Sequence, residues 1–248
     1  MTPFHLTNKT ILITGASSGI GQEAAVSISK MGGSLVLTGR DKKRLAHTLS
    51  LLEGKGHQII AADLLIETER KQLIDQLPNL DGIVHSAGIV TPFPIKFIDQ
   101  EKINQTLNIN YEIPVLLMAG IIRNKKINAC GSVVFLSSIS AQHPHLGGAL
   151  YAGSKAALEA FSKVVALELF PQKIRSNCIS PGMVKTPLYD NAEKEISKES
   201  MDKHVSLYPL GIGQTKDIAN TIIFLLSDAS RWITGINIIL DGGYLLKK

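Results

Sequence analysis

Short apolar runs alternate with longer segments of helical periodicity along most of the chain. Runs such as 10–14, 34–38 and 132–137 are largely apolar at successive positions, which is typical of strands buried on both faces. Strands that alternate with helices need crossover connections, which favour a parallel sheet covered by helices on both sides. We therefore predict an α/β fold with a doubly wound, parallel, seven-stranded sheet.

The same patterns place the individual elements of one domain over residues 1–248. The predicted strands are 10–14, 34–38, 57–61, 81–86, 132–137, 174–179 and 236–240. The predicted helices are 19–31, 41–53, 67–76, 100–124, 151–170 and 216–226. Asp41 is a plausible N-cap of the second helix. In this architecture ligands bind beyond the carboxyl ends of the strands, which is where the motifs described below fall.

Composition and charge argue against several classes of function. No apolar run reaches the roughly 18 residues that a membrane span needs, and no basic segment with an apolar core opens the chain. The net charge is +5, yet the basic residues are scattered and aromatics make up only 5% of the chain, so an anionic ligand fits better than nucleic acid. The two cysteines are expected to be buried thiols and are not spaced as metal ligands. We expect a cytoplasmic protein with no metal, membrane or nucleic-acid partner.

A glycine-rich turn, Thr14-Gly-Ala-Ser-Ser-Gly-Ile-Gly21, follows the first predicted strand and opens a helix. Glycine permits a tight turn and lets a pyrophosphate approach the backbone. The helix start offers unpaired N–H groups and the positive end of the helix dipole. Its position favours nucleotide binding over a purely structural turn and indicates a Rossmann-type domain.

Tyr151 and Lys155 are one turn apart on a predicted helix and share a face. A free phenol has a pKa of about 10, and a nearby ammonium favours the phenolate. Lowering this pKa by roughly three units requires about 4 kcal/mol. Taken alone, such a pair is usually a solvated helix face.

Pro114 lies inside the long predicted helix 100–124. Because proline has no N–H, the carbonyl of Asn110 loses its helical donor. A buried carbonyl needs another partner, and water is the natural one. The alternative interpretation is a simple packing kink.

Taken in order, these motifs resemble the short-chain dehydrogenase/reductase family over essentially the whole chain. Thr14 to Gly21 looks like its cofactor signature, and Ser138, Tyr151 and Lys155 match its catalytic spacing. Two further similar segments are His85-Ser-Ala-Gly88, in place of Asn-Asn-Ala-Gly, and the closing Leu240-Asp-Gly-Gly243. Pro181-Gly182 with Thr186 resembles the nicotinamide loop of the family. The two replaced asparagines imply an altered local hydrogen-bond network, and His85 is expected to be a satisfied core histidine rather than a catalytic base.

The resemblance implies four catalytic residues. Tyr151 is the acid/base, Lys155 supports it, Ser138 polarises the substrate oxygen and Asn110 holds a water linked to the lysine. Ser137 is the alternative to Ser138. The implied cofactor contacts are Gly15, Ser17, Ser18, Gly19, Ile20, Gly21, Arg40, Asp63, Leu64, Ala87, Gly88, Tyr151, Lys155, Pro181, Gly182, Val184 and Thr186.

The end of the second strand bears on the choice of nicotinamide. Family members specific for NAD usually have an acidic residue where this chain has Gly39, and Arg40 follows. An arginine can hold a 2′-phosphate with two hydrogen bonds, and Ser17 can add another. We therefore favour NADP(H). If Arg40 only points to solvent, NAD is used as well.

The substrate is poorly encoded in the sequence. The resemblance favours a carbonyl reductase, such as a 3-oxoacyl-acyl-carrier-protein reductase, acting on a small-molecule or acyl-carrier-linked substrate. The alternatives are a dehydrogenase of a sugar, polyol or hydroxysteroid, and a non-catalytic nicotinamide-binding regulator. A variable substrate lid is expected at about 188–208, and His143 and His145 either line the pocket or are ordinary loop residues.

The helices 100–124 and 151–170 are apolar around more than one face. A helix that covers a sheet should keep one polar side, so the excess indicates a second buried face. The resemblance implies that these helices pair across a two-fold axis, and a homotetramer is expected.

Overall fold

The computed structural model describes residues 3–187, 189 and 198–247. Its main sheet is parallel throughout, with seven strands in the order β3-β2-β1-β4-β5-β6-β9, which confirms the predicted doubly wound fold. The strands are β1 (Thr10–Thr14), β2 (Ser34–Thr38), β3 (Gln58–Ile59), β4 (Leu80–His85), β5 (Ile127–Leu136), β6 (Arg175–Pro181) and β9 (Asn237–Leu240). Two short strands, β7 (Val184–Lys185) and β8 (Gly213–Gln214), form a separate parallel pair.

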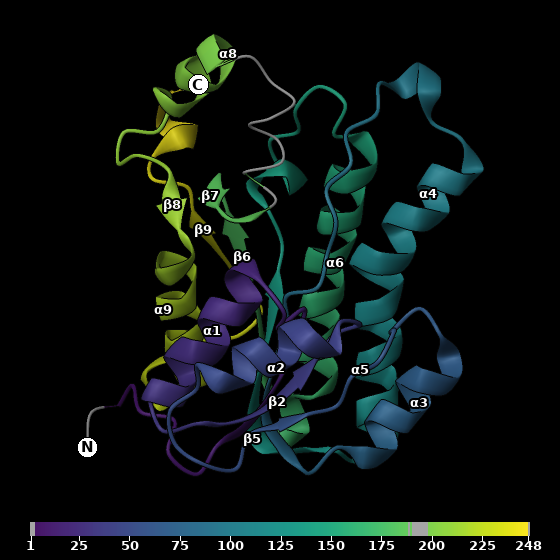
Figure 1. The fold of residues 1–248 in the computed structure, drawn as a ribbon, viewed down its shortest axis with the longest axis vertical. Coiled ribbons are helices and arrows are strands. Elements are labelled where there is room, and N and C mark those ends of the chain that lie inside the picture. Colours follow the sequence, from purple (N-terminus) through teal and green to yellow (C-terminus); the bar gives the residue numbers. More distant parts are fainter. Residues whose placement is uncertain (1–2, 188, 190–197, 248) are drawn as a thin grey trace.

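Helices cover both faces of this sheet (Figure 1). They are α1 (Gly19–Lys30), α2 (Lys42–Ser50), α3 (Glu67–Gln76), α4 (Gln100–Leu107), α5 (Ile113–Arg123), α6 (Ala149–Glu168), α8 (Lys198–Val205) and α9 (Thr215–Leu226). Short 3₁₀ turns lie at Ile95–Phe97, Ile139–Ala141, Phe170–Gln172, Asp228–Ser230 and Tyr244–Lys247. None of the helices in the described ranges is both long and apolar enough to span a membrane.

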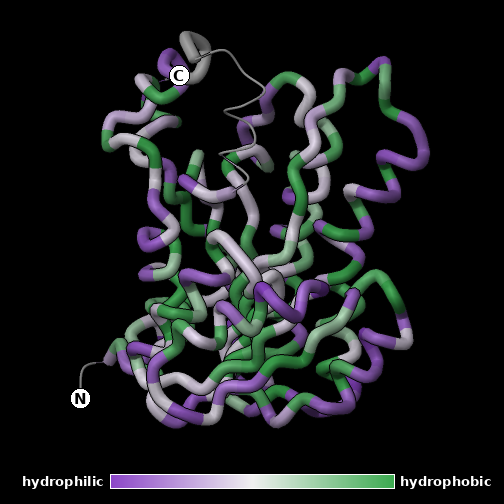
Figure 2. The backbone as a smooth tube through the Cα atoms, in the orientation of Figure 1, coloured by the Kyte–Doolittle hydropathy of each residue, from purple (hydrophilic) through white to green (hydrophobic). Residues whose placement is uncertain are grey.

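The core consists of two apolar clusters, one on each side of the sheet. Residues of α1, α2 and α9 pack with one set of strand side chains, and residues of α3, α5 and α6 pack with the other. Hydrophobic positions lie mostly along the strands and the nearby parts of the helices, while hydrophilic positions lie mostly at the periphery (Figure 2). Burial on both faces explains why the strands have no polar alternation.

Several element ends agree with the sequence prediction. β1, β2 and α3 have the predicted bounds, and Asp41 caps α2 by accepting a hydrogen bond from the backbone N–H of Arg44 at 3.0 Å. The prediction was wrong for the start of β5, which begins at Ile127. Cys130 within it has a φ of 62° and is exposed, so only Cys178 is the buried thiol expected of both cysteines. The pairing of β4 with β5 also shifts register between Leu80 and Gly82.

The predicted long helix 100–124 is interrupted by a π-helical segment, Asn108–Glu112, between α4 and α5. The backbone N–H of Ile113 donates to the carbonyl of Asn108, five residues earlier. The segment ends two residues before Pro114, whose nitrogen has no hydrogen to donate to a helical partner. The wider π-helical turn accommodates this missing hydrogen bond, and Asn110 within it is fully buried.

Candidate active site

The turns that follow β1 and β4 lie in direct contact. The Thr14 hydroxyl oxygen accepts hydrogen bonds from the backbone N–H groups of Ser86 (3.1 Å) and Ala87 (3.2 Å). Gly15 has a φ of 67°, and a Cβ there would lie 2.9 Å from the Ala87 backbone. A Cβ on Gly21 would lie only 2.4 Å from the carbonyl oxygen of Gly15. Only glycine fits these two positions, because a side chain would collide with the neighbouring backbone. The turn that the sequence assigns to a pyrophosphate therefore packs directly against the turn after β4.

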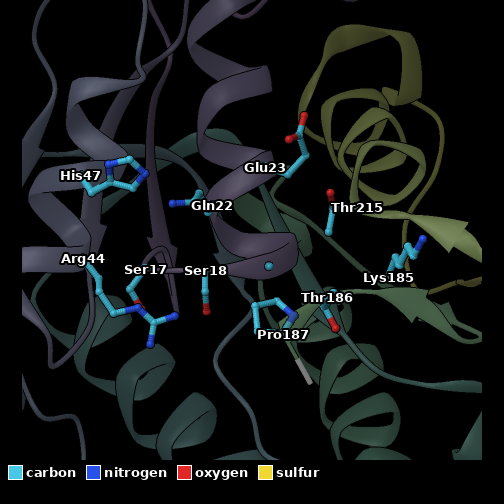
Figure 3. Close-up of a pocket in the computed structure, with 11 residues that line it drawn as sticks. Ser17, Ser18, Gln22, Glu23, Arg44, His47, Lys185, Thr186, Pro187 and Thr215 are labelled. Atoms are coloured by element: carbon cyan, nitrogen blue, oxygen red, sulfur yellow. The ribbon is translucent and has the colours of Figure 1, made fainter. Parts of the chain in front are cut away.

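The start of α1 is available to an anion. Ser18, the N-cap, makes no side-chain hydrogen bond to the helix, which leaves the first N–H groups without a side-chain cap. A pocket of about 380 Å³ lies against this end of the helix (Figure 3). Four lining residues were predicted as cofactor contacts: Ser17, Ser18, Gly19 and Thr186. The others were not predicted: Gln22, Glu23, Arg44, His47, Lys185, Pro187 and Thr215.

Two arginines near the end of β2 differ in position. Arg40 is exposed and is not among the residues that line the pocket. Arg44, four residues later and within α2, does line it, and its side chain extends toward Ser17 (Figure 3). Among the described residues no salt bridge involves the Arg44 guanidinium, so its donors remain available to an anionic ligand.

Two of the predicted cofactor contacts, Asp63 and Leu64, follow β3. The Asp63 side chain accepts a hydrogen bond from the backbone N–H of Leu65 at 3.1 Å, and the Asp63 N–H donates to Glu69 at 2.7 Å. Leu64 is buried, and its carbonyl accepts a hydrogen bond from Arg70. These contacts hold the turn in place at the same edge of the sheet as the glycine turn.

Lys155 is buried and lies beside Tyr151 on α6. Its Nζ donates to the carbonyl of Leu136 at 2.7 Å and lies 5.7 Å from the centroid of the Tyr151 ring. Burial disfavours the ammonium and lowers the pKa of Lys155 to about 8. The lysine can therefore exchange a proton near neutral pH.

Tyr151 is half-buried and hydrogen-bonded to Ser138. Burial raises the pKa of the phenol, and the hydrogen bond with Ser138 opposes this shift only in part. In the chain by itself, burial thus moves the pKa of the phenol in the direction opposite to the one expected from the neighbouring ammonium. The phenol keeps its proton at neutral pH.

The structure separates the two candidate serines. Ser138 lies two residues beyond β5 and contacts Tyr151. It caps the short 3₁₀ turn by accepting a hydrogen bond from the backbone N–H of Ser140 at 3.1 Å. Ser137 points elsewhere and donates to the carboxylate of Glu159 at 2.7 Å. The hydroxyl that faces the tyrosine is thus that of Ser138, as the spacing predicted.

Asn110 reaches the same place from the π-helical segment. Its side-chain amide donates to the carbonyl of Ile89 at 2.9 Å and accepts from the Ile89 N–H at 2.8 Å. It also donates to Ser154 on α6 at 3.2 Å. A Cβ on Gly88 would lie 3.2 Å from the Asn110 side-chain oxygen and 3.5 Å from Lys155 Nζ, so this glycine lies against both groups.

The predicted nicotinamide loop, which follows β6, borders the glycine turn. Gly182 donates to the carbonyl of Leu240 at 2.8 Å, which fixes the loop to β9. Val184 begins β7, and the Thr186 side chain lies 3.6 Å from the position of a Cβ on Gly19. Of the predicted lid 188–208, residues 188 and 190–197 lie outside the described residues.

His85 departs from its expected environment. It is buried and stacks on Phe135 with ring centroids 4.6 Å apart, so it is a core histidine. It is not satisfied, however, since Nε2 has no hydrogen-bond partner among the described residues. Burial lowers the pKa of His85 to about 3, which keeps the ring neutral. His143 and His145 are exposed loop residues.

The described part of the chain contains no group of three or more side chains able to hold a metal ion. The fold and the strand-end site define a dinucleotide-binding α/β protein with a serine, a tyrosine and a lysine gathered beside the glycine turn. A family model described as "Enoyl-(Acyl carrier protein) reductase" matches residues 15–245. The chain belongs to the short-chain dehydrogenase/reductase family, whose members are oxidoreductases acting on CH–OH and C=O groups with NAD(P).

Similar proteins cover nearly the whole chain. Human "Dehydrogenase/reductase SDR family member 4" is 32% identical, over 96% of this chain and 88% of that protein. The 3-oxoacyl-[acyl-carrier-protein] reductase of Rickettsia felis is 31% identical, over 97% of this chain and 98% of its own. A solved short-chain type dehydrogenase/reductase from Mycobacterium ulcerans superposes with a TM-score of 0.87 at 31% identity, covering 98% of this chain and 91% of that one.

Proposed function

We propose that this protein is an NADP(H)-dependent ketone reductase that moves a hydride between the nicotinamide and a carbonyl or alcohol substrate. The observation that carries the proposal is the convergence of Ser138, Tyr151, Lys155 and Asn110 next to the glycine turn. A 3-oxoacyl thioester, free or linked to an acyl carrier, is the favoured substrate class, supported by the name of the Rickettsia felis relative. A sugar, polyol or hydroxysteroid is the alternative.

The residues present fit a nicotinamide dinucleotide. Gly15 and Gly21 leave the backbone clear where a pyrophosphate would approach, and the start of α1 offers N–H groups to it. Pro181, Gly182, Val184 and Thr186 would flank the nicotinamide. When bound, the cofactor supplies the hydride for reduction.

The proton for the substrate oxygen comes from Tyr151. Its raised pKa keeps the phenol protonated at neutral pH, which suits a proton donor and hence the reductive direction. The Ser138 hydroxyl, held beside the phenol, hydrogen-bonds the same substrate oxygen. Lys155, with its pKa of about 8, can restore the proton to the tyrosine, and Asn110 holds the neighbouring backbone of Ile89 in place.

For the 2′-phosphate of NADP(H), Arg44 joins the predicted Arg40. The pocket carries Arg44 and Ser17 together, and Gly39 places no carboxylate at the end of β2 to repel the phosphate. Guanidinium groups bind phosphate through two parallel hydrogen bonds. This arrangement supports NADP(H) over NAD(H).

The test is Tyr151→Phe, which removes only the phenolic oxygen. We expect turnover of an acetoacetyl thioester to fall by more than about 10²-fold while NADPH affinity, measured by fluorescence titration, is kept. Parallel assays with sugar, polyol and steroid substrates and both cofactors identify the substrate class. Near wild-type turnover in the variant would refute the assigned role. Nucleotide binding without turnover on any substrate would instead support a regulator.

A homotetramer is part of the proposal. Val164 and Leu167 on α6 are 45% and 76% exposed, which gives this helix an apolar outer face. Phe161 does not belong to that face, because it packs on Phe135 and Tyr111 within the protomer. Light scattering of the wild type and of Leu167→Asp measures the assembly, and a monomeric wild type would contradict the proposed tetramer.

The proposed cytoplasmic location is tested separately, by cell fractionation.

A further inference from the structure

Glu159 lies on α6 one turn beyond Lys155 and two turns beyond Tyr151, on the same face of the helix. Its half-buried carboxylate collects four hydrogen bonds. The donors are Ser137 Oγ at 2.7 Å, Asn237 Nδ2 at 2.9 Å, Ser180 Oγ at 3.0 Å and Gln142 Nε2 at 3.3 Å. Neither the motifs of the sequence nor the proposed mechanism uses this residue.

The donors come from several segments around the reacting groups. Ser137 directly follows β5 and precedes Ser138, and Gln142 follows the 3₁₀ turn Ile139–Ala141. Ser180 precedes Pro181 at the start of the predicted nicotinamide loop, and Asn237 lies in the neighbouring strand β9. One carboxylate thus joins β5, β6 and β9 to the helix that carries Tyr151 and Lys155.

We infer that Glu159 is a positioning residue, which fixes Ser138 and the Pro181 loop relative to the tyrosine and lysine. This inference rests on the proposed catalytic roles of those groups. A displacement of about 1 Å at a reacting group can cost roughly 10²-fold in rate, so the placement of both segments matters for turnover.

A second link between α6 and the sheet lies away from the reacting groups. Ser162 and Ser176 hydrogen-bond at 2.9 Å and also join α6 to β6, but further from the carboxyl ends of the strands. Both are buried, so this pair contributes to the fold without touching the reacting segments. Ser162→Ala is therefore a control for a loss of stability alone.

The test compares Glu159→Gln with Glu159→Ala. Three of the four donors bind the same oxygen, Oε1, which glutamine retains. Glutamine therefore preserves most of the geometry without the charge, and alanine removes both. Glu168→Ala, an exposed change at the end of the same helix, is the surface control.

We expect Glu159→Ala to lower kcat for an acetoacetyl thioester about 10- to 100-fold, with KM changed less than threefold. Glu159→Gln should stay within about threefold of wild type, as should Ser162→Ala and Glu168→Ala. Hydrogen–deuterium exchange should accelerate in 137–142 and 180–186 in the alanine variant. That readout requires no turnover.

The inference is overturned if Glu159→Ala keeps its kcat, or if Glu159→Gln loses as much kcat as Glu159→Ala. It is also overturned if Ser162→Ala, with the same loss of melting temperature as Glu159→Ala, loses as much kcat.

If Glu159→Ala does not fold, Ser137→Ala is used instead, because it removes a single donor. It should still lower kcat at least fivefold, and an unchanged kcat would refute the proposal. Tyr151→Phe distinguishes failure of the proposed function from failure of this inference. An active Tyr151→Phe variant would refute the proposed function. An inactive Tyr151→Phe variant together with a Glu159→Ala variant of normal turnover would refute only the inference about Glu159.

Discussion

The candidate active site has two halves, one beside β1 and β4 and one beside β5 and β6, and they are held together by different kinds of contact. On the side of β1 and β4, the turns meet through backbone atoms, and Gly15 and Gly21 stand where a side chain would collide with the main chain. On the side of β5 and β6, the segments are joined by side chains, through Lys155 on the Leu136 carbonyl and Glu159 on three strands. The first half depends on the absence of atoms and the second on the presence of particular polar ones.

This difference determines how each half fails. An added methyl group cannot be accommodated where the obstacle is backbone, because the backbone is fixed by the sheet. A lost polar group on the other side leaves the shape of the site nearly unchanged but releases a segment from its position. The same substitution can therefore have opposite effects in the two halves.

Glycine to alanine makes the strongest comparison. Gly21→Ala places a Cβ 2.4 Å from the Gly15 carbonyl oxygen, and we expect a loss of about 3 kcal/mol in the free energy of unfolding and of most nucleotide affinity. Gly153→Ala on α6 meets no atom within 4 Å and should stabilise the protein by about 0.5–1 kcal/mol. Urea unfolding and NADPH titration measure both variants. Equal effects of the two changes would remove the distinction between the halves.

The nucleotide half contains one place where side chains decide. We expect Arg44→Ala to weaken NADPH by about 2 kcal/mol, roughly 30-fold in Kd, and to leave NADH nearly unchanged. Arg40→Ala, the change that the sequence alone favours, should have a smaller effect because Arg40 is exposed and does not line the pocket. Titrations of both variants with both nucleotides settle the order. A larger effect at Arg40 would restore the original assignment.

The smallest expected effect is a pH dependence of stability from Lys155. Its pKa falls from 10.5 to about 8 on folding, so between these values the unfolded chain binds more protons and the free energy of unfolding rises with pH. The slope is at most about 1.4 kcal/mol per pH unit. Burial raises the pKa of Cys178 to about 12 and also raises the pKa of Tyr151. Both groups therefore lower the free energy of unfolding as the pH rises above about 9.

The useful window is therefore about pH 7.5 to 9, measured by urea unfolding. Lys155→Met has no ammonium to bury and should lack the rise, although it also loses the hydrogen bond to Leu136. Parallel slopes in wild type and variant would show that the lysine is not desolvated in solution.

The sequence predicted the parallel sheet because strands buried on both faces have a continuous apolar pattern that survives in any context. It also located the glycine turn and the order of Ser138, Tyr151 and Lys155. It could not locate Arg44, since its approach to Ser17 depends on how α2 packs. Glu159 shares a face with Lys155, so helix spacing offered a signal, but a glutamate at such a position is usually solvated. The start of β5 was missed because Asn128-Ala-Cys-Gly131 has the composition of a turn.

The π-helical segment Asn108–Glu112 changes the phase of the helix that it interrupts. One additional residue in a turn rotates every later position by about 100° relative to an uninterrupted helix. Asn110, within the segment, lies at the site and binds the backbone of Ile89, whereas Ile113 and Leu117, beyond it, belong to the apolar core. Loss of one residue from the segment would turn Asn110 away from Ile89 while leaving each helix intact.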